Sequence, residues 1–166
     1  MAGSLVLIQE TTVSSGVSSV TLTGIDTSFN VYKLVISGLE VDTDGTTLSI
    51  RVTTSGSADT TSNYDRADKQ LISSSSFLNS SNTNQDNWAE SICGTGTGEA
   101  SNGVFYLFCF PDSTENSFIT RETNTFDNNP RIISRYGGGV HTVDQSCDGI
   151  QFFVTSGNID DFTVNE

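Results

Sequence analysis

The sequence predicts an all-β protein, a jelly-roll-like antiparallel β-sandwich with long Ser/Asn/Gly-rich loops. Apolar residues recur mainly at every second position, which places alternate side chains on one face of a strand. The segments between these runs contain Gly, Asn, Asp and Ser, the residues that favour turns. The chain has only two prolines, and no window shows a convincing apolar stripe of helical period.

Strands are expected at "SLVLIQETT" (4–12), "VSSVTLTG" (17–24), "VYKLVISG" (31–38), "TLSIRVTT" (47–54), "GVFYLFCF" (103–110), "SFITRET" (117–123) and "GIQFFVTS" (149–156). Weaker strand patterns occur at "RIISRY" (131–136) and "DFTVNE" (161–166). The run 103–110 is apolar on both faces, which predicts a central strand whose second face is covered by another sheet, a loop or a subunit. In 64–72, "YDRADKQLI", at most a short helical turn is expected.

The middle of the chain, 55–102, is rich in Ser, Asn, Thr and Gly and is interpreted as long surface loops. Loops of this length pack on a sandwich when they carry apolar anchors. The anchors here are Leu71, Ile72, Phe77, Leu78, Trp88 and Ile92. The same loops are the predicted contact surface.

Length and charge narrow the class of protein. The 166 residues are enough for one compact domain, 1–166, whose core needs no disulfide or metal. The net charge of −13 disfavours nucleic acid as a partner, because phosphate binding depends on clustered cations. The longest apolar run, 104–110, is far shorter than the ~20 residues of a membrane span, and the N-terminus lacks a secretory-signal pattern.

The cysteines indicate neither a disulfide framework nor a zinc site. Cys93, Cys109 and Cys147 are an odd number without CxxC spacing. Cys109 lies in the most apolar run and is expected to pack as a small core residue. This usage fits a reducing cytoplasm, and no cofactor is expected.

One acidic motif has two interpretations. In "DTDG" (42–45), Asp42 and Asp44 resemble the first half of a calcium loop, but no closing Glu follows. Asp-Gly between two strand-like runs is also the signal of a hairpin turn. The turn is the preferred interpretation.

The only histidine, His141, is the one residue that any Ser-His-Asp or Cys-His site would have to include. No G-x-S-x-G signature is present, so a structural role in a turn after "YGGGV" is expected. The glycine-rich stretches 94–98 and 137–139 lack the rest of a phosphate-binding motif and are interpreted as flexible loops.

Three aromatic residues are the candidate contact residues. Trp88 with Tyr64 or Tyr136 would form a platform for stacking on a sugar, or else anchor loops or a protein interface. Asp160 and Asp161 would point to opposite faces of a strand, which argues against a joint acid–base role.

Six stretches cover most of the chain: "MAGSLVLIQETTVSSGVSSVTLTGID", "SFNVYKLVISGL", "SGSADTTSNYDRA", "GTGTGEASNGVFYLF", "YGGGVHT" and "GIQFFVTSGNIDDFTV". With these stretches the whole chain, essentially end to end, resembles a family of small virion proteins from tailed phages of marine bacteria, especially cyanophages. The resemblance implies a non-enzymatic virion component with a jelly-roll-like sandwich, assembled in the host cytoplasm. Family members carry Tyr-Gly shortly after "SGNI", and this sequence lacks that pair, so their C-terminal contact is not carried over.

The resemblance leaves the place in the particle open. The first hypothesis is a capsid decoration protein that docks on the major capsid protein in several copies, as a homo-oligomer. The alternative is a tail fibre or receptor-binding module that contacts a host-surface glycan through the region of Trp88. A hydrolase acting on envelope sugar is a third hypothesis, which the lack of a convincing acid–base pair disfavours.

Overall fold

The computed structural model describes residues 5–74 and 77–165. Every regular element in these ranges is a strand, and every strand pair is antiparallel. The strands are β1 (Glu10–Val13), β2 (Ser19–Thr23), β3 (Val31–Val41), β4 (Thr46–Thr54), β5 (Ser57–Ala58), β6 (Tyr64–Ile72), β7 (Leu78–Gln85), β8 (Trp88–Cys93), β9 (Ser101–Phe108), β10 (Ser117–Phe126), β11 (Ile132–His141), β12 (Gly149–Val154) and β13 (Ile159–Asn165). Within the described ranges there is no helix long and apolar enough to cross a membrane.

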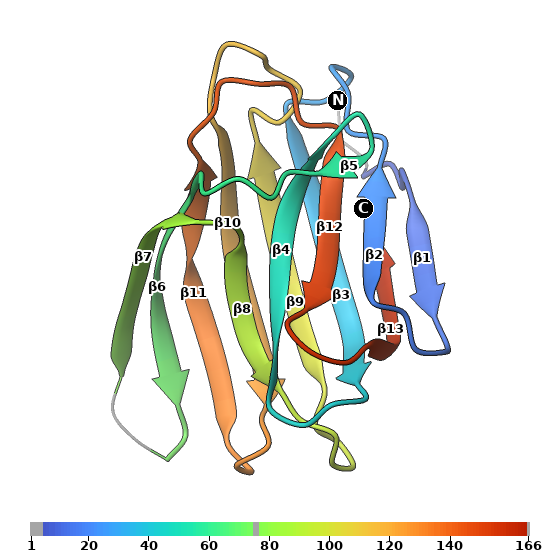
Figure 1. The fold of residues 1–166 in the computed structure, drawn as a ribbon, viewed down its shortest axis with the longest axis vertical. Helices are drawn as coiled ribbons and strands as arrows, with labels where there is room; N and C mark the ends of the chain where they lie inside the picture. Colours follow the sequence, from blue (N-terminus) through green and yellow to red (C-terminus); the bar gives the residue numbers. More distant parts are fainter. Residues whose placement is uncertain (1–4, 75–76, 166) are drawn as a thin grey trace.

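The strands form two sheets packed face to face (Figure 1). The larger has eight strands in the order β1-β13-β3-β9-β10-β11-β6-β7. The smaller has the order β2-β12-β4-β5, and β8 also pairs with β4. The predicted all-β, antiparallel sandwich is confirmed, and β9 is a central strand as expected, between β3 and β10.

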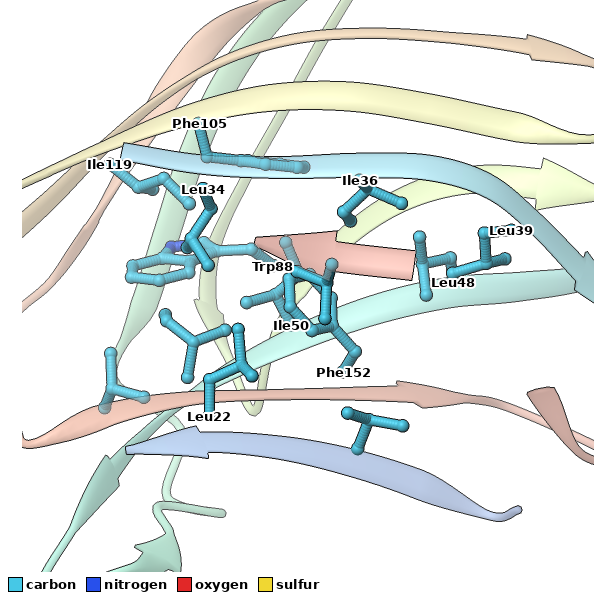
Figure 2. Close-up of a cluster of buried hydrophobic side chains, with 14 of the residues drawn as sticks. Leu22, Leu34, Ile36, Leu39, Leu48, Ile50, Trp88, Phe105, Ile119 and Phe152 are labelled. Carbon is cyan, nitrogen blue, oxygen red and sulfur yellow. The ribbon is translucent and has the colours of Figure 1, made fainter. Parts of the chain in front are cut away.

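The core lies between the two sheets and follows from the period-two pattern. In β10 buried and outward-facing residues alternate along the whole strand, from Ser117 to Phe126. Figure 2 shows side chains of both sheets meeting in this layer, among them Phe105 of the larger sheet and Ile50 and Phe152 of the smaller. Burying each such side chain stabilises the fold by about 1.5–3 kcal/mol relative to leaving it exposed.

The prediction of long loops over 55–102 is wrong, because most of this segment is in strands. This segment forms β5, β6, β7 and β8, and 64–72 is the strand β6 rather than a helical turn. β6 carries Arg66 and Asp68 where a core-facing strand normally carries apolar residues. β7 is almost entirely exposed and therefore has no apolar alternation to reveal it.

The predicted turn at 42–45 is confirmed, whereas the glycine stretch 137–139 differs from its prediction. "DTDG" does form a turn, in which Gly45 has a φ of 73°, but it joins β3 of the larger sheet to β4 of the smaller one and is not a hairpin. Residues 137–139 lie inside β11 and form no loop. A Cβ on Gly139 would lie 2.5 Å from Trp88 Nε1 and 2.8 Å from the Asp65 carbonyl oxygen, so glycine is what lets the indole ring approach the strand.

The cysteines are all free, and one prediction about them is wrong. Cys109 is only half-buried and lies just after β9, with a φ of 61°, so it is not a core residue. Cys93 and Cys147 are the buried ones.

Candidate functional site

The predicted aromatic platform does not form. Trp88 and Tyr64 are fully buried, and their rings pack edge to face with centroids 5.1 Å apart. Trp88 Nε1 donates to the Asp65 carbonyl, and the Tyr64 hydroxyl donates to the Asp59 carbonyl at 2.7 Å. Neither ring presents a face to a sugar in solution, so that prediction is wrong for these two residues. Tyr136, on the outer face of β11, is 43% exposed and lies apart from them.

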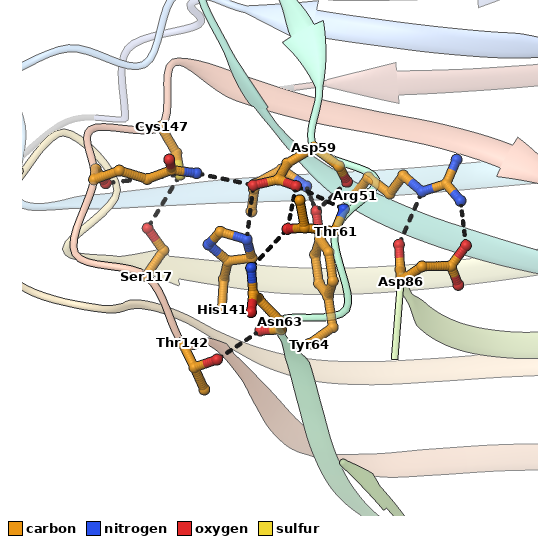
Figure 3. Close-up of polar contacts among 12 residues, drawn as sticks. Arg51, Asp59, Thr61, Asn63, Tyr64, Asp86, Ser117, His141, Thr142 and Cys147 are labelled. Carbon is orange, nitrogen blue, oxygen red and sulfur yellow. Dashed lines mark hydrogen bonds and ion pairs between the residues drawn. The ribbon is translucent and has the colours of Figure 1, made fainter. Parts of the chain in front are cut away.

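His141 belongs to a buried polar group around Asp59 (Figure 3). Its Nε2 lies 3.2 Å from Asp59 Oδ2, which also accepts a hydrogen bond from Gln145 Nε2 at 3.1 Å. The imidazole packs on the Tyr64 ring with centroids 4.7 Å apart. His141 has no exposed surface, and its contacts with Asp59 and Tyr64 make it a packing residue for the connection between β5 and β6.

Burial and hydrogen bonds together set the ionisation of this group. It lowers the pKa of His141 despite the nearby Asp59 carboxylate. Burial also opposes ionisation of Asp59, but hydrogen bonds from Thr61 and Gln145 outweigh it and lower the Asp59 pKa. The Cys147 thiol, 3.4 Å from Ser117 Oγ, is buried, and its pKa is raised for that reason. A thiol held in its protonated form is a poor nucleophile.

The acidic turn has its carboxylate oxygens engaged by the protein. Asp42 accepts hydrogen bonds from the Asn158 backbone N–H at 2.7 Å and from Asn158 Nδ2 at 2.8 Å. Among the residues described, no group of three or more His, Cys, Asp or Glu side chains is placed to hold a metal ion. Asp160 and Asp161 are both exposed, at an irregularity in the pairing of β13 with β3.

A buried ionic cluster was missed at the sequence level. Arg121 of β10 donates to Asp68 of β6 at 2.6 Å and to Glu90 of β8, and Arg66 donates to the same Asp68 oxygen at 2.5 Å. The Arg135 guanidinium lies 3.7 Å from Asp68. The alternation in "SFITRETNTF" could have revealed it, because Arg121 falls on the same face as Ile119. The cluster links the two sheets and lies inside the fold.

One surface groove with a largely apolar lining, of about 510 Å³, lies beside β3. We call it the β3 groove, and it is lined by Leu5, Val6, Leu7, Ile8, Phe29, Val31, Tyr32, Lys33, Val35, Tyr106 and Asn165. Leu5, Val6 and Leu7 are 84, 56 and 62% exposed, and Tyr106 of the central strand β9 is 42% exposed. A contiguous apolar surface of this kind marks interaction sites on soluble proteins.

The β3 groove lies where the larger sheet lacks a strand. β13 pairs with β3 only from Val41 to Val35, opposite Asn165. Beyond that point Val31–Lys33 pair with β9 on one side, and no strand among the described residues pairs with them on the other. The segment 5–9 was expected to be part of a strand, but the first strand begins only at Glu10. An extended peptide with apolar side chains fits a site of this type, because it adds backbone hydrogen bonds to a free strand edge.

Comparison of the chain with protein-family models, with curated proteins and with solved structures finds no match.

Proposed function

We propose that this chain is a non-enzymatic structural protein of a phage virion, and specifically a decoration protein that docks on the exterior of the head. The observation that supports docking is the β3 groove, where apolar side chains of the segment 5–8, β3 and β9 face solvent together. The sequence resemblance to small phage virion proteins supports the setting. The second face of β9, expected to be covered, has no second sheet of the described residues over it, which leaves it for a subunit of the shell.

The chemistry of the β3 groove indicates how the shell protein would bind. The partner would supply an extended segment with alternating apolar residues, and Lys33 is the one cationic side chain in the lining. Backbone pairing with β3 would give affinity, and the apolar side chains would give specificity. Tyr106 lies in the middle strand of this face, the kind of residue that dominates interface energetics.

The test is binding of the purified protein to phage heads that lack it, measured by cosedimentation. Tyr106→Asp is expected to weaken binding by about 30-fold, the effect of losing a ~2 kcal/mol central contact. Tyr136→Asp is the matched control, because Tyr136 is an equally exposed tyrosine of the same sheet outside the groove. Equal binding of both variants would contradict docking through the β3 groove.

Cryo-electron microscopy of the intact virion tests the location separately. Density for the sandwich on the head lattice is expected. Density at the tail would instead make the protein a tail fibre or receptor-binding module, with Tyr136 the one predicted aromatic that is accessible to a glycan.

A further inference from the structure

We propose that β7 is the interface between two copies of this chain. The free edges of two β7 strands would pair antiparallel about a two-fold axis, so that the eight-stranded sheet continues across a dimer. This inference is independent of where the protein sits in a particle. It concerns the edge of the larger sheet farthest from β1 (Figure 1).

The first observation is that β7 has one strand partner. It pairs with β6 from Gln70 opposite Leu78 to Tyr64 opposite Gln85, and it is the terminal strand of the sheet. Its other edge therefore presents backbone N–H and C=O groups that no strand of the described chain pairs with. Ser80 is half-buried, and the other seven residues of β7 are exposed.

The second observation is that the part of β7 from Leu78 to Asn82 lacks the features that normally prevent edge pairing, because the one irregularity in its pairing with β6 lies beyond it. Natural sheets protect their edges with short strands, charged residues or proline. The opposite edge, β1, has four residues including Glu10, β2 has five residues, and β8 carries Glu90. β7 has eight residues, "LNSSNTNQ", with no charge and no proline.

The charge distribution allows a second copy to be the partner. Two chains with a net charge of −13 repel one another, but 70–85 contains no charged residue, so this edge brings no carboxylates into contact. On the neighbouring strand β6, Asp65 lies at one end and Lys69 near the other, both on the outer face. Antiparallel pairing places Asp65 of each copy at the same end as Lys69 of its partner. Parallel pairing would place like charges together.

The register of β6 and β7 limits where the pairing occurs. It is regular from Leu78 to Asn82 and shifts between Tyr64 and Arg66, and Asn84 has a φ of 54°. The straight part of the edge is thus Leu78–Asn82, with Ser80 at its centre. Ser and Asn side chains on facing strands can both donate and accept hydrogen bonds, which suits a pairing of identical polar strands.

Sedimentation and light scattering of the full chain test the proposal. The expected mass is twice 17.7 kDa. In the variant Asn79→Lys/Ser81→Lys, two exposed outer-face residues of β7 become cations, and with Ser80 at the centre position 79 of each copy faces position 81 of the other, so a monomer is expected. Thr12→Lys, an exposed position on the opposite edge strand β1, is the matched control and should remain dimeric. A monomeric wild-type protein, or a dimeric double variant, would overturn the proposal.

Hydrogen–deuterium exchange gives a second readout that does not depend on how well the variants fold. Amides of 78–82 should become protected as the wild-type concentration rises, whereas those of 10–13 should not change. Concentration-dependent protection at the β3 groove without any at β7 would assign the dimer to the groove and overturn the proposal. Near-ultraviolet circular dichroism of the double variant should match that of the wild type.

Discussion

Replacing Arg121 with Met should destabilise the protein severely. The Arg121 side chain is 1% exposed and donates to two buried carboxylates, those of Asp68 and Glu90. Asp68 keeps its contact with Arg66, but Glu90 loses the one cation it pairs with among the described residues. Removing one member of a buried ionic cluster costs about 3–5 kcal/mol, because a charge stays buried without compensation.

The matched control is Arg51→Met in β4. Arg51 pairs with Asp86 at 2.7 Å, but that carboxylate is 52% exposed, and the guanidinium also lies 4.2 Å from the Phe153 ring centroid. An exposed ion pair and a cation–π contact together contribute about 1–2 kcal/mol. The two variants remove the same side chain from paired positions that differ mainly in burial.

Urea unfolding measures the difference. For an m-value of about 2 kcal/mol/M, Arg121→Met should lower the midpoint by roughly 2 M and Arg51→Met by less than about 1 M. Adding Glu90→Gln to Arg121→Met should restore part of the loss, because the orphaned charge is then removed. Equal midpoints for the two arginine variants, or no rescue by Glu90→Gln, would refute the reasoning about burial.

Three further outcomes are expected. Because burial lowers the folded-state pKa of His141, the free energy of unfolding should fall as the pH drops from 6.5 toward that lowered pKa, and His141→Gln should flatten this dependence in pH-resolved unfolding curves. Gly139→Ala should lower the melting temperature more than Gly38→Ala, since a Cβ clashes at the first position and meets only backbone strain at the second, where φ is 65°. In the native protein a thiol reagent should modify Cys109 first, and Cys109→Ser should remove that fast phase, because the other two cysteines are buried.

The strands that the sequence predicted most clearly are those with at least one apolar face. "TLSIRVTT" and "SFITRET" alternate cleanly and became β4 and β10. β7 was missed because an edge strand exposed on both faces has no hydrophobic period, and its Ser and Asn residues are the residues of loops. β6 was missed because its inward positions Arg66 and Asp68 are charged: Arg66 pairs with Asp68 on the same strand, and Asp68 also pairs with Arg121 of β10, which lies far away in the sequence.

The candidate site was harder to predict for a related reason. The residues around Trp88 in the sequence are polar and resemble a loop, yet the indole ring is buried in the core next to Gly139. The pairing of β11 with β6 and β10 is what places Gly139 there, and that pairing joins segments far apart in the sequence. The β3 groove depends on where β13 stops pairing along β3, which is a matter of strand register. Local composition contains no information about that register.

The two proposed contacts lie far apart on the larger sheet, and this arrangement has a consequence for affinity. The β3 groove is next to β13 and β3, whereas β7 is separated from β3 by β9, β10, β11 and β6. Pairing through β7 would therefore leave both grooves of a dimer free. Since two linked sites bind a repeating surface far more tightly than one, each docking contact can be weak while the dimer stays attached. The β7 double variant should then bind isolated shell subunits as the wild type does, but dissociate faster from an assembled lattice.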